Sequence, residues 1–472
     1  MHEYFNYSGT QSLHPYLYLS CKKEEECACS VTVMFFPLRN RRANKHFPEK
    51  EYQMEGWIQV ETMKRRDFLK TSGAAVLTVS VGANCFAGLP DSRKLVATAA
   101  DRERYLARLL QELCIDIGPR PYSSPEYLRA TEVVMREMKL GLPDVSYDPF
   151  TNDRWRLDGS QSMTIDGQPI TAYLYMNSPG TPPGGLTGVL RLSGDSETHY
   201  QLVVPGSDQV LAHLFIQSSP HARPIYYGPA LAERVQNLPA IGIGKDDTNT
   251  LAQAAERGVT VTYEGRATWD HNVESRNVVG ILPGESEEEC VFLAHLDTVY
   301  TAPGANDNTA TLILMLMWAH AFSGRRPRKT LTFITPDVEE CGMTGASKYV
   351  EKRKAAGTFG RIKYVFNFDS FTWGPDFIIY GRDDGLISIF NDAKKEHNIG
   401  GEVKVNDHDG FWLDAQPFRD EGIRAISVST GGSDVFDRCW HQPADLPENI
   451  SVEWVENNFL IFTRFIGRVL EL

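Results

Sequence analysis

From about residue 277 onward, short apolar runs alternate with segments of helical periodicity, and this alternation restricts the fold more than any other feature. Apolar runs of this length, bounded by turn residues, are typical of buried strands. Strands separated by helices predict an α/β domain with a mixed, mostly parallel central sheet flanked by helices. The expected strands are 291–294, 331–334, 363–368 and 424–428, and the expected helices are 310–322, 344–354, 386–397 and 452–470.

Two further regions precede this alternating pattern. Residues 98–153 carry two amphipathic helical runs separated by the Gly-Pro break at 117–121, and we expect them to form the N-terminal part of the α/β domain. In residues 154–270, short apolar runs are separated by turns rich in Gly, Pro and Ser. This texture predicts a small β-rich domain inserted into the larger one, which residues 271–472 complete.

The segment 63–87 has the composition of an export signal. Met63 begins a run with paired arginines followed by Phe-Leu-Lys, and a short apolar stretch of small residues comes next. This pattern indicates a twin-arginine signal peptide, cleaved after Ala87, whose apolar stretch is too short to span a bilayer. Because such a signal is read at the start of a chain, we hypothesise that translation starts at Met63 and that residues 1–62 are a non-native N-terminal extension. The mature protein is then expected in the periplasm or outside the cell, with no membrane span.

The charge balance argues against a nucleic-acid partner. The chain has 48 Lys and Arg against 61 Asp and Glu, a net charge of −13, and no basic cluster follows the predicted signal. Phosphate backbones require a positive face. After the signal only four cysteines remain, and although export permits disulfides, we expect buried free thiols. They are Cys114, Cys290, Cys341 and Cys439.

Polar residues follow the predicted strands, where the carboxyl ends of a parallel sheet form its ligand-binding edge. Taken singly, each has a plain structural explanation, such as a helix cap for Asp307 or a solvated acidic loop for the Glu339–Glu340 pair. Together they supply two imidazoles and three carboxylates, a ligand set that zinc accepts. The predicted metal ligands are His295, Asp307, Glu340, Asp369 and His441.

Two neighbouring carboxylates complete the predicted site. Glu339 adjoins a metal ligand and can act as a general base toward water. Strand alternation places Asp297 on the same side as His295, where a carboxylate can orient the imidazole ring. One carboxylate shared by two ions, with two further ligands on each side, would build a site for two Zn²⁺ ions.

Residues 100–472 resemble the zinc-dependent exopeptidases of the bacterial leucyl aminopeptidase and glutamate carboxypeptidase type. The resemblance lies in the order His-x-Asp, Gly-Ala-x-Asp-Asn, Glu-Glu-x-Gly, Asp and His. It implies the phosphorylase/hydrolase-like fold of that family, and the insert resembles its protease-associated domain. By the same resemblance, Asp307 bridges both zinc ions, His295 and Asp369 complete one site, and Glu340 and His441 the other. Glu339 would be the catalytic base, and Asp297 would hold His295.

The sequence departs from the family pattern at 413–418. Related enzymes carry Ser-Asp-His-x-Pro-Phe there, whereas this chain has Leu-Asp-Ala-Gln-Pro-Phe. The predicted metal ligands are unaffected, but the substrate pocket is expected to differ, and no residue is assigned to stabilise the oxyanion.

These features predict an exported enzyme that hydrolyses peptide bonds at the end of a peptide or small protein, as an aminopeptidase in preference to a carboxypeptidase. A carboxypeptidase or a glutaminyl-cyclase-like enzyme on the same fold are the alternatives. A non-catalytic binding ectodomain is a third, but such relatives typically lose metal ligands, and this chain keeps all five.

Overall fold

The computed structural model describes residues 16–20, 29–35, 75–81, 91–194, 196–381, 383–406 and 413–471. The chain divides into two units, residues 1–90 and 91–472. In the first, three antiparallel strands pair in the order β1-β2-β3, with bounds Tyr16–Ser20, Cys29–Phe35 and Ala75–Val81. Apart from these strands, the predicted extension 1–62 and signal 63–87 lie outside the described residues. No helix in the described parts of the chain has the length and apolar character to cross a membrane.

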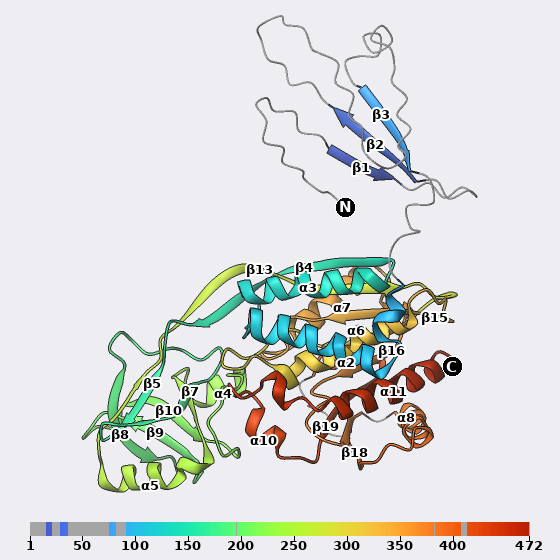
Figure 1. Cartoon of the computed structure of the whole chain (residues 1–472). Coiled ribbons are helices and arrows are strands. Elements are labelled where there is room, and N and C mark those ends of the chain that lie inside the picture. The colour runs from blue at the N-terminus through green and yellow to red at the C-terminus, as the bar shows by residue number, and fades with distance from the viewer. Residues whose placement is uncertain are drawn as a thin grey trace, which may run out of the picture. The chain divides into compact units, whose positions relative to one another are not determined.

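The second unit is built around a mixed eight-stranded sheet with the strand order β18-β17-β19-β16-β14-β15-β13-β4 (Figure 1). The four central strands are parallel, while β17, β13 and β4 pair antiparallel with their inner neighbours. The prediction of a mixed, mostly parallel sheet is therefore confirmed. The strands are β4 (Asp144–Leu157), β13 (Ala267–Leu282), β14 (Ser286–Leu293), β15 (Lys329–Thr335), β16 (Ile362–Phe368), β17 (Asp376–Tyr380), β18 (Val403–Asn406) and β19 (Arg424–Gly431).

Helices cover both faces of this sheet, because successive strand residues point to opposite sides. On one face Phe292, Phe333 and Phe366 pack into the core shared with α2, α3, α6, α8 and α11. On the other, Val291 and Val365 pack with α7 and α9. The helices are α2 (Ala99–Leu110), α3 (Pro125–Gly141), α6 (Ala310–Phe322), α7 (Thr344–Ala355), α8 (Asp384–Glu396), α9 (Gln416–Arg419), α10 (Val435–Cys439) and α11 (Val452–Val469).

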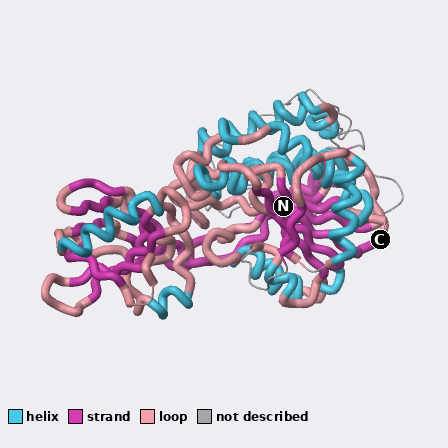
Figure 2. The backbone as a smooth tube through the Cα atoms, turned by 90° about the horizontal axis from the view of Figure 1, so that it is seen from below, coloured by secondary structure: helices cyan, strands magenta, loops and turns pink. Residues whose placement is uncertain are grey.

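A second eight-stranded sheet lies between β4 and β13 in the sequence and forms a separate lobe (Figure 2). Its strand order is β6-β5-β12-β8-β9-β10-β11-β7, and helix α5 packs on it through Leu251 and Ala254. All of its strands fall within residues 154–270, which we retain as the proposed extent of the inserted domain. The elements are β5 (Ser162–Ile165), β6 (Gln168–Ile170), β7 (Ala172–Leu174), β8 (Leu186–Leu192), β9 (His199–Val203), β10 (Val210–Ile216), α4 (Pro229–Arg234), β11 (Ala240–Ile243), α5 (Thr248–Arg257) and β12 (Val261–Glu264).

The two lobes are joined by a long antiparallel ribbon. Strands β4 and β13 pair from Leu157 with Ala267 to Asp144 with Ile281, interrupted by one irregularity after Asp270. They form the edge of the central sheet and continue toward the inserted lobe (Figure 1). The proposed boundary at 153–154 thus falls within β4, because the strand belongs to both lobes.

All four predicted free thiols are confirmed. Cys114, Cys290, Cys341 and Cys439 are buried and form no disulfide. Burial raises the pKa of Cys290 to about 12, so this thiol stays protonated and behaves as a small apolar side chain.

The aromatic layer of the central sheet generates a stability prediction. Phe292 is fully buried, with its ring centroid 5.1 Å from that of Phe333 and 5.4 Å from that of Phe366. We expect Phe292→Ala to lower the free energy of unfolding by about 3–5 kcal/mol, because it leaves a cavity in a packed core. Urea unfolding would measure this, with Ile115→Ala at a 48% exposed position as the control. A loss for Phe292→Ala no larger than for the control would contradict the packing described.

Candidate metal centre

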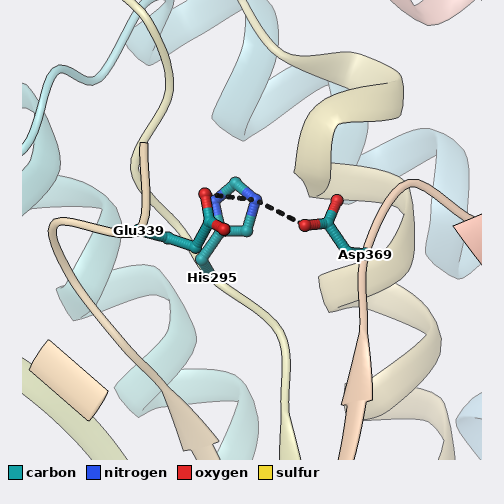
Figure 3. Close-up of side chains that lie close together, drawn as sticks. All are labelled: His295, Glu339 and Asp369. Atoms are coloured by element: carbon teal, nitrogen blue, oxygen red, sulfur yellow. Dashed lines mark ion pairs between the residues drawn. The ribbon is translucent and has the colours of Figure 1, made fainter. Parts of the chain in front are cut away.

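The sheet brings the predicted site residues together at the carboxyl ends of its central strands. His295 follows β14, the Glu339–Glu340 pair follows β15, and Asp369 follows β16. Asp307 precedes α6, and His441 lies between α10 and α11. Figure 3 shows the side chains of His295, Glu339 and Asp369 converging from separate segments. Parallel neighbours end at the same sheet edge, so residues far apart in sequence share one site.

Two groups of potential ligand atoms form within this site. In each group, one such atom per residue lies within 4.8 Å of the others. In the first group, the Nε2 atom of His295 lies 3.8 Å from Glu339 Oε2 and 3.9 Å from Asp369 Oδ2. In the second, which also includes Asp307, the Nε2 atom of His441 lies 3.0 Å from Glu340 Oε2.

Asp307 lies between the two imidazoles and presents one oxygen to each. Its Oδ1 atom is 3.4 Å from His295 Nε2, and its Oδ2 atom is 3.6 Å from His441 Nε2. A carboxylate in this position can serve two cations at once.

Hydrogen bonds fix the orientation of both imidazoles. His295 Nδ1 donates to the backbone carbonyl of Asp297 at 3.0 Å, and His441 Nδ1 donates to that of Pro224 at 2.7 Å. Because a carbonyl can only accept, each neutral ring keeps its proton on Nδ1 and leaves Nε2 with a free lone pair. His295 Nε2 is buried and has no hydrogen-bond partner among the described residues. A buried acceptor left open and facing carboxylates fits a metal ligand.

Asp297 connects the His295 strand to the glutamate pair. The residue is fully buried, and its carboxylate accepts the backbone N–H of Glu339 at 3.2 Å and that of Glu340 at 3.3 Å. The same carboxylate lies 3.6 Å from His295 Nδ1, which bonds instead to the carbonyl of Asp297. Asp297 therefore braces the glutamate loop as well as the histidine.

Arg120 braces the site from behind, a role that sequence reasoning did not assign. Its guanidinium is fully buried and donates to the carbonyls of Leu296 at 3.1 Å and Pro303 at 3.0 Å, and to the Thr309 hydroxyl at 2.6 Å. These acceptors flank His295 and Asp307. The Gly-Pro break at 117–121 could have drawn attention to this segment, but no local pattern indicates where the guanidinium points.

Asp445 holds the turn that carries Asp307. Its carboxylate accepts the backbone N–H groups of Asn306 at 2.8 Å and Asp307 at 3.0 Å, and the Asn306 side-chain amide at 2.8 Å. Burial raises the pKa of Asp445 to about 7. Sequence reasoning assigned no role to this residue.

The electrostatics of the site call for a cation. Burial raises the pKa of Glu339 well above its usual range and that of Asp369 to about 6. Burial lowers the pKa of His295, but Glu339 and the other carboxylates outweigh this effect and hold it well above its usual value. Asp414 is also fully buried, and its carboxylate has no hydrogen-bond partner among the described residues. So many buried carboxylates can ionise together only when cations compensate them, which fits divalent metal ions.

A cavity of about 1100 Å³ opens onto the glutamate pair and His441. One wall comes from the inserted domain, through residues 225–231, and the other from the segments that follow β16 and β19. Five aromatic residues contribute to its lining: Tyr226, Trp373, Tyr380, Phe436 and Trp440. Leu413, two residues before the Ala415 that stands in place of the histidine of related enzymes, also lines the cavity.

Comparisons with known proteins agree with this geometry. Residues 277–466 match the profile of peptidase family M28. Aminopeptidase YwaD of Bacillus subtilis is 26% identical over 374 residues, which are 76% of this chain and 77% of that protein. The structure of a zinc aminopeptidase from B. subtilis superposes with a TM-score of 0.60 at 20% identity, over 81% of this chain and 96% of the other. A peptidase M28 precursor from Shewanella amazonensis gives a TM-score of 0.65 at 18% identity, over 80% and 96%. The resemblance to zinc exopeptidases and the predicted fold are confirmed.

The raised carboxylate pKa values predict opposite effects of pH on the metal-free and zinc-loaded protein. The folded chain retains protons on Asp369 up to about pH 6 and on Asp445 up to about pH 7, against an ordinary value of 3.8. Because the folded state binds more protons than the unfolded state, the stability of the metal-free protein should fall as pH rises from about 4 to about 7. Zinc competes with the proton on Asp369, a proposed ligand, so the stabilising effect of zinc should grow as pH rises through about 6.

Thermal unfolding at pH 5, 6 and 7, with and without zinc, measures both trends. Magnesium at the same concentration is the control, since it prefers sites made only of oxygen ligands. A difference in Tm between zinc-loaded and metal-free protein that stays constant with pH would contradict this account.

Proposed function

Because residues 277–466 form a peptidase family M28 domain, we propose that this protein is a zinc-dependent aminopeptidase that removes residues from the N-terminus of peptides. It uses two zinc ions in the site described above. The proposal also places the enzyme in the periplasm or outside the cell, on the strength of the twin-arginine pattern at 63–87.

The positions of the side chains support a specific ligand assignment. Asp307 would serve as a ligand in both sites, because each of its oxygens faces a different imidazole. His295 and Asp369 complete one site, and Glu340 and His441 complete the other. Glu339 also lies near this group, with its Oε2 atom 3.8 Å from His295 Nε2, but we assign it to proton transfer because Asp307 already presents an oxygen to each imidazole.

Glu339 is the proposed catalytic base. When bound, zinc ions polarise the scissile carbonyl and make water a stronger acid. The Glu339 carboxylate lines the cavity beside the proposed ligands, where it can take a proton from the attacking water and deliver it to the nitrogen of the leaving amine.

Asp297 is a positioning residue in this mechanism. Its carboxylate accepts the backbone N–H groups of Glu339 and Glu340, so it sets where the base lies relative to the second site. Its carbonyl fixes the His295 tautomer. Both contacts hold the base and the histidine in position before the substrate binds, and such prior orientation of reacting groups increases the reaction rate.

The charge of the cavity is the observation that favours an aminopeptidase over a carboxypeptidase. Among its described lining residues there is no Lys or Arg, and one carboxylate, Asp437, lies outside the proposed zinc ligands and base. A terminal carboxylate finds no cationic side chain among these residues, while a terminal ammonium finds a complementary charge at Asp437.

Substitution of Glu339 tests the function. We expect Glu339→Gln to keep two zinc ions per chain and to lower kcat for aminoacyl reporter peptides about 100- to 10,000-fold, the range for loss of a general base. Glu351→Gln, on α7 with a side chain 62% exposed, is the matched control and should retain full activity. Metal analysis and steady-state kinetics provide the two measurements.

The choice of substrates separates the alternative activities. Reporters blocked at the N-terminus and cleavable only from the C-terminus should not be hydrolysed, and a peptide with N-terminal glutamine should not be cyclised. Hydrolysis from the C-terminus, cyclisation, or full activity of Glu339→Gln would each contradict the proposal.

A further inference from the structure

We infer that the inserted domain is a working part of the metal centre, because its residues Ala222–Pro224, here called the docking segment, hold His441 in place. This inference rests on the proposed two-zinc site and assigns the insert a role beyond forming one wall of the cavity. His441 is the proposed ligand whose ring is fixed by a residue outside the α/β domain.

The docking segment contacts the His441 turn through two backbone carbonyls. The Pro224 carbonyl accepts the Nδ1 proton of His441 at 2.7 Å, and the Ala222 carbonyl accepts the side-chain amide of Gln442 at 2.8 Å. Both acceptors belong to the insert, and both donors are 6% exposed. Adjacent side chains of the turn are thus tied to one short stretch of the other lobe.

Arg223, between these two carbonyls, covers the same turn. Its guanidinium carbon lies 3.9 Å from the ring centroid of Trp440 and 5.5 Å from that of Phe436. The Trp440 ring in turn lies 4.3 Å, centroid to centroid, from the His441 ring. A guanidinium over the face of an indole is attracted to the ring, and this attraction is stronger when the pair is desolvated. Arg223 is 6% exposed, and its Nη1 atom has no hydrogen-bond partner in the described parts of the chain.

The core of the insert holds the docking segment in this shape. The Gln217 side chain accepts the backbone N–H of Arg223 at 2.9 Å and donates to the carbonyl of the same residue at 2.7 Å. Gly242 on β11 leaves room for this clamp, since a Cβ atom there would lie 2.7 Å from Gln217 Nε2 and 2.8 Å from the Arg223 carbonyl. The segment is therefore shaped by the insert before it meets His441.

The consequence concerns metal affinity at one site. The hydrogen bond on Nδ1 of a ligating histidine sets its tautomer and ring orientation, and loss of such a partner typically weakens metal binding 10- to 100-fold. His295 donates the equivalent hydrogen bond from Nδ1 to the carbonyl of Asp297, which lies inside the α/β domain. A disturbed docking segment should thus weaken the zinc ion at Glu340 and His441 and leave the ion at His295 and Asp369 in place.

Zinc retention by Arg223 variants tests this inference. The full chain as wild type, Arg223→Met and Arg223→Lys is dialysed against graded zinc–chelator buffers, and zinc per chain is measured. We expect Arg223→Met to lose one of its two zinc ions at a free zinc concentration about 10- to 100-fold higher than wild type does. Arg223→Lys, which keeps the cation over Trp440, should recover most of this difference. Arg276→Met is the control, because it removes a contact of the same 3.9 Å length, to Tyr147, together with hydrogen bonds to Thr131 and Leu128.

Thermal stability measurements distinguish a general folding defect from a defect in the positioning of His441. Thermal unfolding of the metal-free chains should show Arg223→Met to be at least as stable as Arg276→Met, which also loses two hydrogen bonds. If Arg223→Met alone unfolds early, Gln217→Leu replaces it and should show the same selective loss of one zinc ion.

Wild-type affinity at both sites in these variants, or equal weakening at both sites, would overturn the inference. A wild-type chain that holds fewer than two zinc ions would overturn the proposed function itself. Failure of the proposed function is thus detected in the wild-type protein, and failure of the inference is detected in the variants.

Discussion

Repulsion among buried carboxylates is the constraint on which this structure depends. Around the ends of β14, β15 and β16, acidic side chains at most 13% exposed lie close together, and the groups facing them within ion-pair distance are two imidazoles. Without compensation, each ionised group buried in this way would cost several kcal/mol. For Asp297 and Asp445, backbone N–H groups donate hydrogen bonds to the carboxylate and so offset part of this cost. For the carboxylates that face the imidazoles, divalent cations can balance the negative charge, because imidazole nitrogens and carboxylate oxygens are suitable ligands. The same acidic cluster that would destabilise the metal-free fold therefore provides the metal site.

Rigid support behind the site keeps these like charges close together. Arg120 ties the segments around His295 and Asp307 through backbone carbonyls, and Asp445 holds the turn before α6. Such contacts use main-chain atoms, so they fix the path of the chain and leave the functional side chains free to face the cavity. A site held in this way changes little when ligands bind, and little of the binding energy is then spent on rearrangement.

The sequence predicted those parts of the fold and site whose signal is local. Helix α6 begins and ends at the predicted residues, 310 and 322, because its apolar character stops abruptly at Ser323 and Gly324. The proposed ligands were recognisable because each follows a strand or a glycine turn. The β4–β13 ribbon and the partner of His441 could not be predicted in the same way. The hydrogen bond from His441 joins residues 217 positions apart, and a backbone carbonyl such as that of Pro224 has no side-chain signature.

The ribbon formed by β4 and β13 has a consequence for how such proteins can diversify. It attaches the insert through the edge of the central sheet, so genetic exchange of everything between the two strands would leave the acidic cluster untouched. Residues 225–231 would be replaced in that exchange, and with them one wall of the cavity. A foreign insert could therefore bring a new substrate preference in a single recombination event. If the docking segment acts as inferred, only inserts that present a carbonyl where Pro224 does would yield a working enzyme. Selection would then retain only the exchanged inserts that meet this requirement.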